Sequence, residues 1–170
     1  QQAALAKLGH FALQARDLQI LFEHVSAVTR DTLEIEYVKI LELLPDGEHM
    51  LLRAGVGWRE GLVGSATVGS GSNSQAGHTL RSDTPIIVEN LASEARFNGP
   101  ELLVEHGVVS GMSVIIRGDK EPFGVFGAHT AQRRVFTNED VNFLQSVSNI
   151  LSEAMERNRV ESALEESEER

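Results

Sequence analysis

Histidine has the widest chemical repertoire of any residue type in this chain, because its imidazole can bind a metal, transfer a proton or coordinate haem iron. The six histidines stand at positions 10, 24, 49, 78, 106 and 129. No two of them are spaced i,i+4 on a helix and no H-E-x-x-H motif occurs, so the sequence predicts no metal site. His78, His106 and His129 come from the central region where a pocket would form. Any of these three could contact a ligand or a haem iron.

Two glycine-rich segments resemble catalytic or phosphate-binding loops but lack their defining residues. GVGWREGLVG (55–64) has Glu60 where G-x-G-x-x-G needs glycine, and more loop follows it instead of a helix N-terminus. This segment could be a mobile loop over a sheet or the lid of a pocket. GVVSG (107–111) places Ser110 at the wrong position for a nucleophile elbow. With no catalytic triad or carboxylate pair, the sequence gives no argument for an enzyme.

The composition excludes several further functions. The chain of 170 residues has no cysteine, which removes disulfides, thiolate metal sites and thioether attachment of a chromophore. Its net charge of −10 argues against binding to nucleic acid or to an anionic membrane surface. We find no signal peptide and no apolar run long enough to span a membrane, so we expect a cytoplasmic chain.

The two ends of the chain have helical patterns. Leu5, Leu8, Ala12 and Ala15 form a narrow apolar seam near the N-terminus, and Asp17 is placed to cap a second helix. Thr137, with Asp140 three residues later, favours a third helix start, and no helix breaker follows it. Because the first residue is glutamine and the last lies in a helical pattern, we expect the chain to be part of a longer protein.

The middle of the chain has the pattern of strands and turns, because it holds every proline and all glycines but one. Two apolar runs around Pro-Asp-Gly (45–47) predict a β-hairpin. The predicted strands are 37–44, 49–56, 85–90, 108–118 and 123–130, with short helices at 75–81 and 100–106. Short turns between strands indicate a partly antiparallel sheet. Strands that are apolar on both faces need cover on both, from the terminal helices and from residues 55–107.

The order of these elements resembles a GAF domain over about residues 17–155. The segments that carry this resemblance are AGHTLRSDTPIIVENL (76–91), GVVSGMSVII (107–116), and PFGVFGAHT with FTNEDVNFLQSVSNIL (122–150). The resemblance implies an α+β fold with a central antiparallel sheet of five to six strands, terminal helices on one face, and loops and short helices on the other. It divides the chain into an N-terminal signalling and dimerisation helix (1–16), the GAF domain (17–155) and a helical linker (156–170).

The resemblance also implies a ligand pocket, which in GAF domains lies between the sheet and the layer of loops and short helices. By position, the resemblance places Trp58, Val63, Gln75, His78, Phe97, Ser113 and Ala128 in its lining. The Asn-Lys pair of cyclic-nucleotide-binding members is absent, and the lack of cysteine excludes covalent bilin attachment and methionine sulfoxide reduction. The cofactor is therefore unknown: a non-covalent small ligand, a haem, or no ligand at all remains.

The chain looks most like the GAF domains of bacterial sensor histidine kinases and cyclic-di-nucleotide cyclases. ALEESEER (163–170) resembles the lead-in to a PAS domain, which would make the last helix a linker to an output domain. We expect a homodimer whose seam contains Leu5, Leu8, Ala12, Leu144, Leu151 and Met155. The alternative is that these stripes wrap a single core. The main functional hypothesis is a non-catalytic sensory domain that relays ligand binding through its terminal helices, and the alternative is a ligand-free dimerisation module.

Overall fold

The centre of the molecule is a six-stranded antiparallel sheet with the strand order β3-β2-β1-β6-β5-β4. The computed structural model describes residues 1–169. The strands are β1 (Tyr37–Leu43), β2 (His49–Val56), β3 (Thr67–Gly69), β4 (Ile86–Val88), β5 (Ser110–Ile116) and β6 (Gly124–Thr130). This confirms the expected α+β fold, and it places β1 and β6 side by side in the middle of the sheet.

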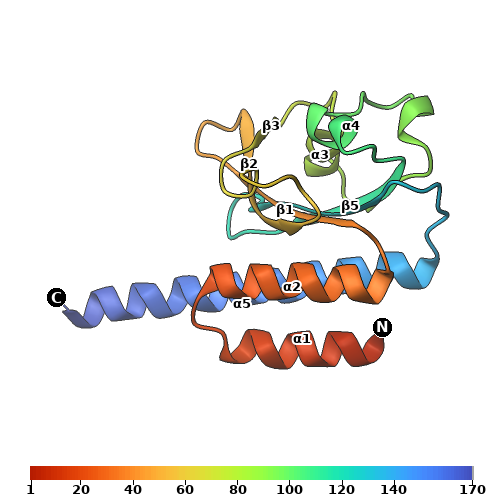
Figure 1. Ribbon diagram of the computed structural model, residues 1–170. Coiled ribbons are helices and arrows are strands. Elements are labelled where there is room, and N and C mark those ends of the chain that lie inside the picture. The colour runs from red at the N-terminus through yellow and green to blue at the C-terminus, as the bar shows by residue number, and fades with distance from the viewer. Residues whose placement is uncertain (170) are drawn as a thin grey trace.

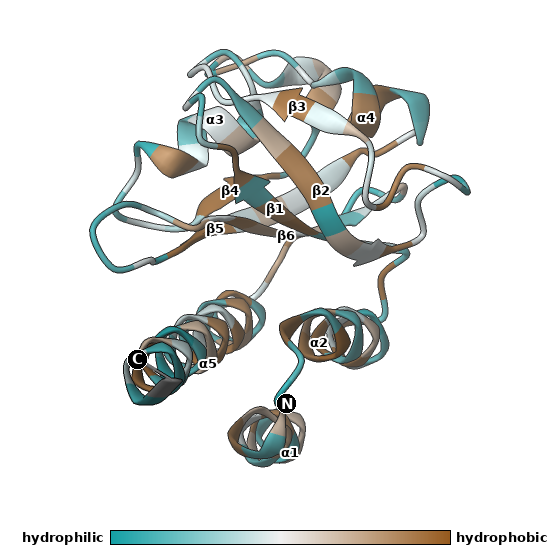
Figure 2. Ribbon diagram, turned by 90° about the vertical axis from the view of Figure 1, so that its left-hand side faces the viewer, coloured by the Kyte–Doolittle hydropathy of each residue, from teal (hydrophilic) through white to brown (hydrophobic). Residues whose placement is uncertain are grey.

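Three helices from the two ends of the chain lie on one side of the sheet (Figure 1). They are α1 (Gln2–Gln14), α2 (Leu18–Leu33) and α5 (Asn138–Glu169). Figure 2 shows α2 and α5 directly beneath the sheet and α1 beneath both of them, as a further layer. The largest apolar core, including Phe22, Ile40 and Phe126, fills the space between this sheet face and the helices.

The helix starts follow the capping signals in the sequence. The Asp17 carboxylate accepts a hydrogen bond from the backbone N–H of Gln19 and opens α2. At the start of α5, the Asp140 N–H donates to Thr137 Oγ1 and the Thr137 N–H donates back to the Asp140 carboxylate. This reciprocal pair is a capping box, with aspartate in the usual place of glutamate.

The opposite face of the sheet is covered by the segments between β2 and β5. They contain α3 (Gln75–Leu80), a single 3-10 turn at Leu91–Ser93 and α4 (Glu101–Glu105). Two smaller apolar clusters lie there, and Trp58 packs against both of them. The expected cover on both faces is therefore present. The short strand β3, at the sheet edge next to β2, falls in a segment for which the sequence predicts only loop.

The predicted dimer seam lies largely inside the single chain. Leu8, Ala12, Leu144 and Leu151 are buried in the core between the helices, and Leu5 and Met155 pack against it. These six residues therefore fit the alternative interpretation, in which the apolar stripes pack around the core of a single chain. Beyond Met155, α5 projects past the body of the molecule (Figure 1), and none of its described side chains there is buried. Among the described residues, no helix combines the length and apolar character needed to cross a membrane.

Candidate functional site

Two buried polar side chains lie at the centre of the sheet, on the face away from the terminal helices. They are Lys39 on β1 and His129 on β6, and both are fully buried. Their neighbours in sequence, including Val38 and Ala128, belong to the core on the helix side. Because side chains alternate across a strand, Lys39 and His129 face the layer formed by the loops, α3 and α4.

Glycines on the surrounding strands make room for these two side chains. A β-carbon at Gly127 would lie 2.8 Å from both Lys39 Cε and His129 Nε2, so the two side chains flank the same point. A β-carbon at Gly111 would lie within contact distance of the His129 ring. Because Gly111 on β5 and Gly127 on β6 have no β-carbon, they leave a recess over the sheet, which we call the cradle. The side chains of Lys39 and His129 occupy it.

Neither side chain has a hydrogen-bond partner among the described residues. Lys39 Nζ, His129 Nδ1 and His129 Nε2 are all inaccessible to solvent and unpaired. Leaving a buried donor or acceptor unpaired costs about 1–3 kcal/mol, and more for a charged group. Three such atoms in one place are therefore a considerable destabilising feature, of the kind found where a fold keeps groups ready for a ligand.

The electrostatics of the pair follow from burial. Desolvation lowers the pKa of the Lys39 ammonium from 10.5 to about 7. The pKa of His129 is held well below its usual value, first by burial and then by repulsion from Lys39. No carboxylate contributes to either shift among the described groups. Without a counter-ion, the His129 ring is therefore neutral at neutral pH, and Lys39 is protonated in only part of the molecules.

Trp58 covers this part of the sheet. Its indole N–H donates to the Val38 carbonyl oxygen at 2.9 Å, and its ring centroid lies 6.5 Å from that of His129. Tyr37 and His106 pack against the same indole, with centroids 5.0 Å away in each case. The glycine-rich segment thus lies over this face of the sheet, which both the loop and the lid interpretations expect.

His106 ties the Trp58 segment to α4. Its Nε2 accepts a hydrogen bond from the Arg59 N–H at 3.0 Å, and its Nδ1 lies 2.8 Å from the Leu102 carbonyl oxygen. With both ring nitrogens engaged in this way, Nδ1 carries the proton and His106 is neutral. Neither nitrogen is free for a haem iron.

Gln75 and Ser113 meet next to the cradle. The Gln75 side-chain amide donates to Ser113 Oγ at 3.2 Å, and the Thr79 hydroxyl lies 2.7 Å from the same oxygen. All three residues are buried, so this network joins α3 to β5 beneath the second layer. The structure therefore brings together two of the residues expected in the pocket and adds Thr79 to them.

The other expected pocket residues are dispersed. The rings of His78 and Phe97 pack together at 5.3 Å, away from the sheet centre and in a cluster with β4 and α4. Two assignments are wrong. Val63 is 41% exposed on the loop surface, and Ala128 lies on the helix face of β6 in the main core. The spacing of a loop does not reveal which residue turns inward, and the face of Ala128 depends on a strand register that the sequence alone did not fix.

Two surface hollows flank the second layer without reaching the cradle. One of about 310 Å³ lies between the β3 region and the start of α4, and one of about 340 Å³ lies beside Phe97. Neither is lined by Lys39 or His129. A molecule that reaches the cradle must therefore displace part of the layer above it.

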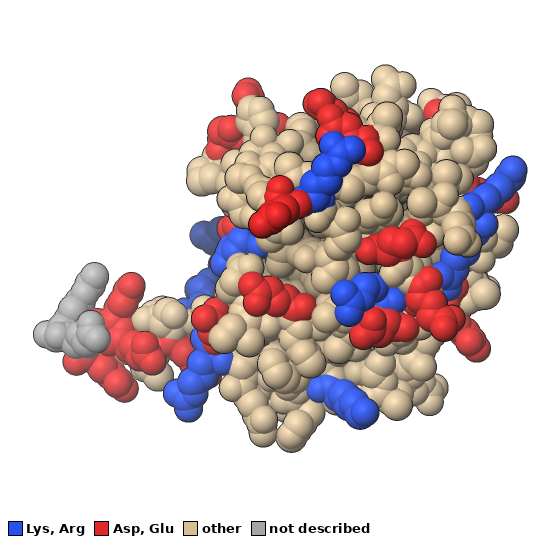
Figure 3. All heavy atoms as spheres, viewed as in Figure 1, with Lys and Arg blue, Asp and Glu red and all other residues tan. Residues whose placement is uncertain are grey.

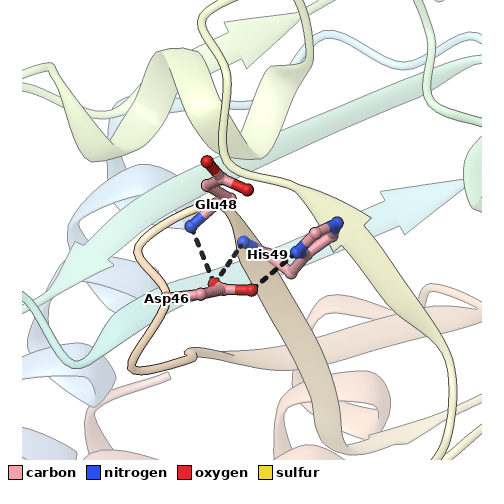
Figure 4. Close-up of side chains that lie close together, drawn as sticks. All are labelled: Asp46, Glu48 and His49. Carbon is pink, nitrogen blue, oxygen red and sulfur yellow. Dashed lines mark hydrogen bonds and ion pairs between the residues drawn. The ribbon is translucent and has the colours of Figure 1, made fainter.

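A separate cluster of Asp46, Glu48 and His49 occupies the β1–β2 turn (Figure 4). The Asp46 carboxylate accepts from the backbone N–H groups of Glu48 and His49 and lies 2.9 Å from His49 Nδ1. The hydrogen bond to His49 is the main cause of the lowered pKa of Asp46, and it raises the pKa of His49. All three side chains are exposed, and these contacts close the turn.

The chain belongs to the GAF domain family, whose model matches residues 17–155. This confirms the resemblance seen in the order of elements. No curated protein matches the chain at a significant level.

Solved structures share the fold at low sequence identity. The GAF domain of a phosphoenolpyruvate-protein phosphotransferase from Coxiella burnetii is similar with a TM-score of 0.84 and 15% identity, over 95% of this chain and 96% of that chain. A free methionine-R-sulfoxide reductase from Neisseria meningitidis, in complex with its substrate, gives 0.77 and 14% over 92% and 88%. A phycocyanobilin-bound GAF domain from a cyanobacterial phytochrome gives 0.76 and 18% over 94% and 96%.

Proposed function

We propose that this GAF domain is a non-catalytic sensory module that binds a small molecule between the sheet and the layer of loops and short helices. The observation that carries the proposal is the buried, unpaired Lys39–His129 pair in its glycine cradle. Bound small molecules in two of the similar structures support it, since those domains have the same fold.

The strand that carries Lys39 offers a route for the signal. Lys39 faces the cradle, whereas Val38 and Ile40 on the same strand pack in the core with α2 and α5. A ligand that shifts β1 therefore acts on the helices that lead out of the domain. Only a ligand with different affinities for two such packings can transmit a signal. We expect the domain to serve a cytoplasmic signalling protein of the histidine kinase or diguanylate cyclase type, with a PAS domain following.

Native mass spectrometry of the freshly purified protein, with its absorbance spectrum, tests the sensory function. A stoichiometric extra mass that is lost in the Lys39→Met variant and retained in Lys120→Met would support it, because Lys120 is an exposed lysine on the β5–β6 turn. A Soret band would identify haem as the ligand. An unliganded mass in every preparation, with no small molecule bound after incubation in a cell extract, would contradict the proposal.

A ligand-free dimerisation module is the second candidate, and two exposed leucines favour it. Leu13 at the end of α1 is 68% exposed and Leu164 on the projecting part of α5 is 59% exposed. They line the same surface hollow between the two helices. These residues take the place of the buried seam that the sequence predicted. Figure 3 shows acidic side chains crowded around the projecting helix, so its self-association is expected to strengthen with salt.

Light scattering after gel filtration tests the dimer. Leu164→Glu should convert a dimer to a monomer, whereas Val135→Glu should leave the mass unchanged, because Val135 is an exposed apolar residue before α5 and away from the hollow. A monomeric wild-type protein at all concentrations and salt levels would exclude this second candidate.

A further inference from the structure

The chemistry of the cradle indicates which class of molecule it takes. Lysine ammonium offers three donors and no acceptor, and an imidazole offers one or two donors depending on its charge. Lys39 and His129 therefore offer several donors side by side, and the atoms around them do not use these donors. What is missing is a group of acceptors.

The faces around this point add no compensating charge. The adjoining backbone positions on β5 and β6 are Gly111 and Gly127, and the covering side chain is the indole of Trp58. Two other polar groups nearby, the Tyr37 hydroxyl at the start of β1 and the His106 ring after α4, are already hydrogen-bonded to backbone atoms. An anion would therefore supply both the missing acceptors and the missing negative charge.

We infer that the ligand of this site is a small organic carboxylate, whose two oxygens accept hydrogen bonds from Lys39 Nζ and from the His129 ring. This inference rests on the proposed sensory function. Lys39 and His129 lie side by side over Gly127, so the two oxygens of a single carboxylate that enters above them would reach both side chains. Charge-assisted hydrogen bonds of this kind are about twice as strong as neutral ones. A phosphate dianion would need more donors than these two side chains present.

The size of the ligand follows from the packing. Lys39, His129 and Trp58 fill the space over the glycines, and the neighbouring hollows do not open onto it. Gly57, Gly61 and Gly64 in the covering segment have positive φ angles of 92°, 87° and 90°, which glycine adopts without strain. These positions let the segment bend away and close again over a small aliphatic molecule.

The only tryptophan of the chain lies over the site and provides a direct readout. We would titrate the protein with sodium acetate, propionate, pyruvate and succinate, at constant ionic strength, and follow Trp58 fluorescence and the thermal midpoint. At least one of these carboxylates should produce a saturable change. Acetamide and propionamide, which have the same shape without the charge, should produce none.

Variants show whether the effect arises in the cradle. The apparent affinity should fall about tenfold or more in Lys39→Met and stay unchanged in Lys120→Met, since a tenfold loss corresponds to one strong contact. The thermal midpoint of Lys39→Met without ligand shows that the variant is folded. If no carboxylate of the four binds, or if Lys39→Met binds equally well, or if only inorganic phosphate binds, the inference is wrong.

The outcome of native mass spectrometry separates this inference from the proposed function. A neutral small molecule bound to the purified protein would preserve the sensory function and overturn the carboxylate assignment. If the purified protein holds no bound molecule and does not respond to carboxylates, both the sensory function and the carboxylate assignment are wrong.

Discussion

At the scale of single residues, the protonation state of Lys39 links the stability of the fold to pH. Its amine has a pKa of about 7 in the folded chain and an ordinary value of 10.5 when exposed. Between these values the unfolded chain binds one proton more than the folded chain, so raising the pH favours folding. The penalty for burying Lys39 is fully present below pH 7 and is relieved as the pH rises.

We therefore expect Lys39→Met to be more stable than the wild type at neutral pH, by an amount that shrinks as the pH rises. The shift from 10.5 to about 7 corresponds to a change of up to about 5 kcal/mol across the window. Urea denaturation of both proteins at a series of pH values measures this difference. Lys120→Met is the control and should follow the wild type. A stability difference that does not vary with pH would show that Lys39 keeps an ordinary pKa in the folded chain, so that its ammonium is solvated or paired there.

The cradle glycines make a second residue-scale prediction. A β-carbon at Gly111 would collide with the His129 ring and approach the Ala128 carbonyl oxygen at 3.1 Å. Overpacking of this kind costs about 1–3 kcal/mol, so Gly111→Ala should lower the free energy of unfolding by that amount. Gly69→Ala, in the edge strand β3 with open space around it, should change it far less. Equal effects in calorimetry would mean that the cradle is not tightly filled.

Part of this site was predicted from the sequence, but Lys39 at its centre was not. His129 was among the three histidines singled out, whereas Lys39 was hidden in an apolar run, YVKILELL, where a lysine normally marks the solvent face. The pairing becomes visible only when the register aligns Lys39 with Gly127 and His129 with Gly111. A glycine opposite each polar residue on the neighbouring strand could have indicated the site. Recognising these pairs, however, requires that the strand register is already known.

At the scale of elements, the loop over the site depends on one histidine. In His106→Phe the ring can still pack against Trp58 and Tyr37, but the acceptor for the Arg59 N–H is lost. One hydrogen bond contributes about 0.5–1.5 kcal/mol, so the population of the open loop should rise about two- to tenfold. Acrylamide quenching of Trp58 should increase accordingly. His24→Phe, which alters the α1–α2 contact instead, serves as the control.

An unchanged quenching constant in His106→Phe would mean that another contact restrains the loop. The candidates are the hydrogen bond from the Trp58 indole to the Val38 carbonyl oxygen and the one from the Arg59 side chain to the Glu105 carbonyl oxygen at the end of α4. A quenching constant that rises equally in His24→Phe would indicate general loosening of the fold. Only a change confined to the His106 variant identifies this contact as the element that holds the loop shut.

Elements with local signals were predicted well from the sequence. The Pro-Asp-Gly turn lies between strands that begin at the predicted residues, and the caps at Asp17 and Thr137 open helices. β3 was missed because its three residues form a strand only by pairing with β2. The apolar seam of α1 was predicted correctly, but the surface that it packs against was not. An apolar stripe can pack against its own chain as well as against a second copy, and the sequence does not distinguish the two.

At the scale of the whole molecule, α5 has two parts with different surroundings. Its first part holds Phe143, Val147 and Leu151 in the main core. The side chain of Arg157 donates to the Ala12 carbonyl oxygen, Asn158 is half-buried, and the side chains described from Arg159 on are exposed. A helix without tertiary contacts is only marginally stable in water, because packing provides most of the stability of helices in proteins. The distal part therefore needs a covering surface to stay ordered.

Hydrogen exchange along α5 tests whether a second copy provides that cover. Amides from 138 to 155 should exchange slowly at every protein concentration, because the core protects them. Amides beyond 160 should become protected as the concentration rises, if the Leu13–Leu164 hollow is the dimer contact. Leu164→Glu should abolish only the concentration-dependent part. Rapid exchange beyond 160 at all concentrations would instead describe a solvated linker, so that any signal from the Lys39 cradle would have to leave the domain through the packed half of α5.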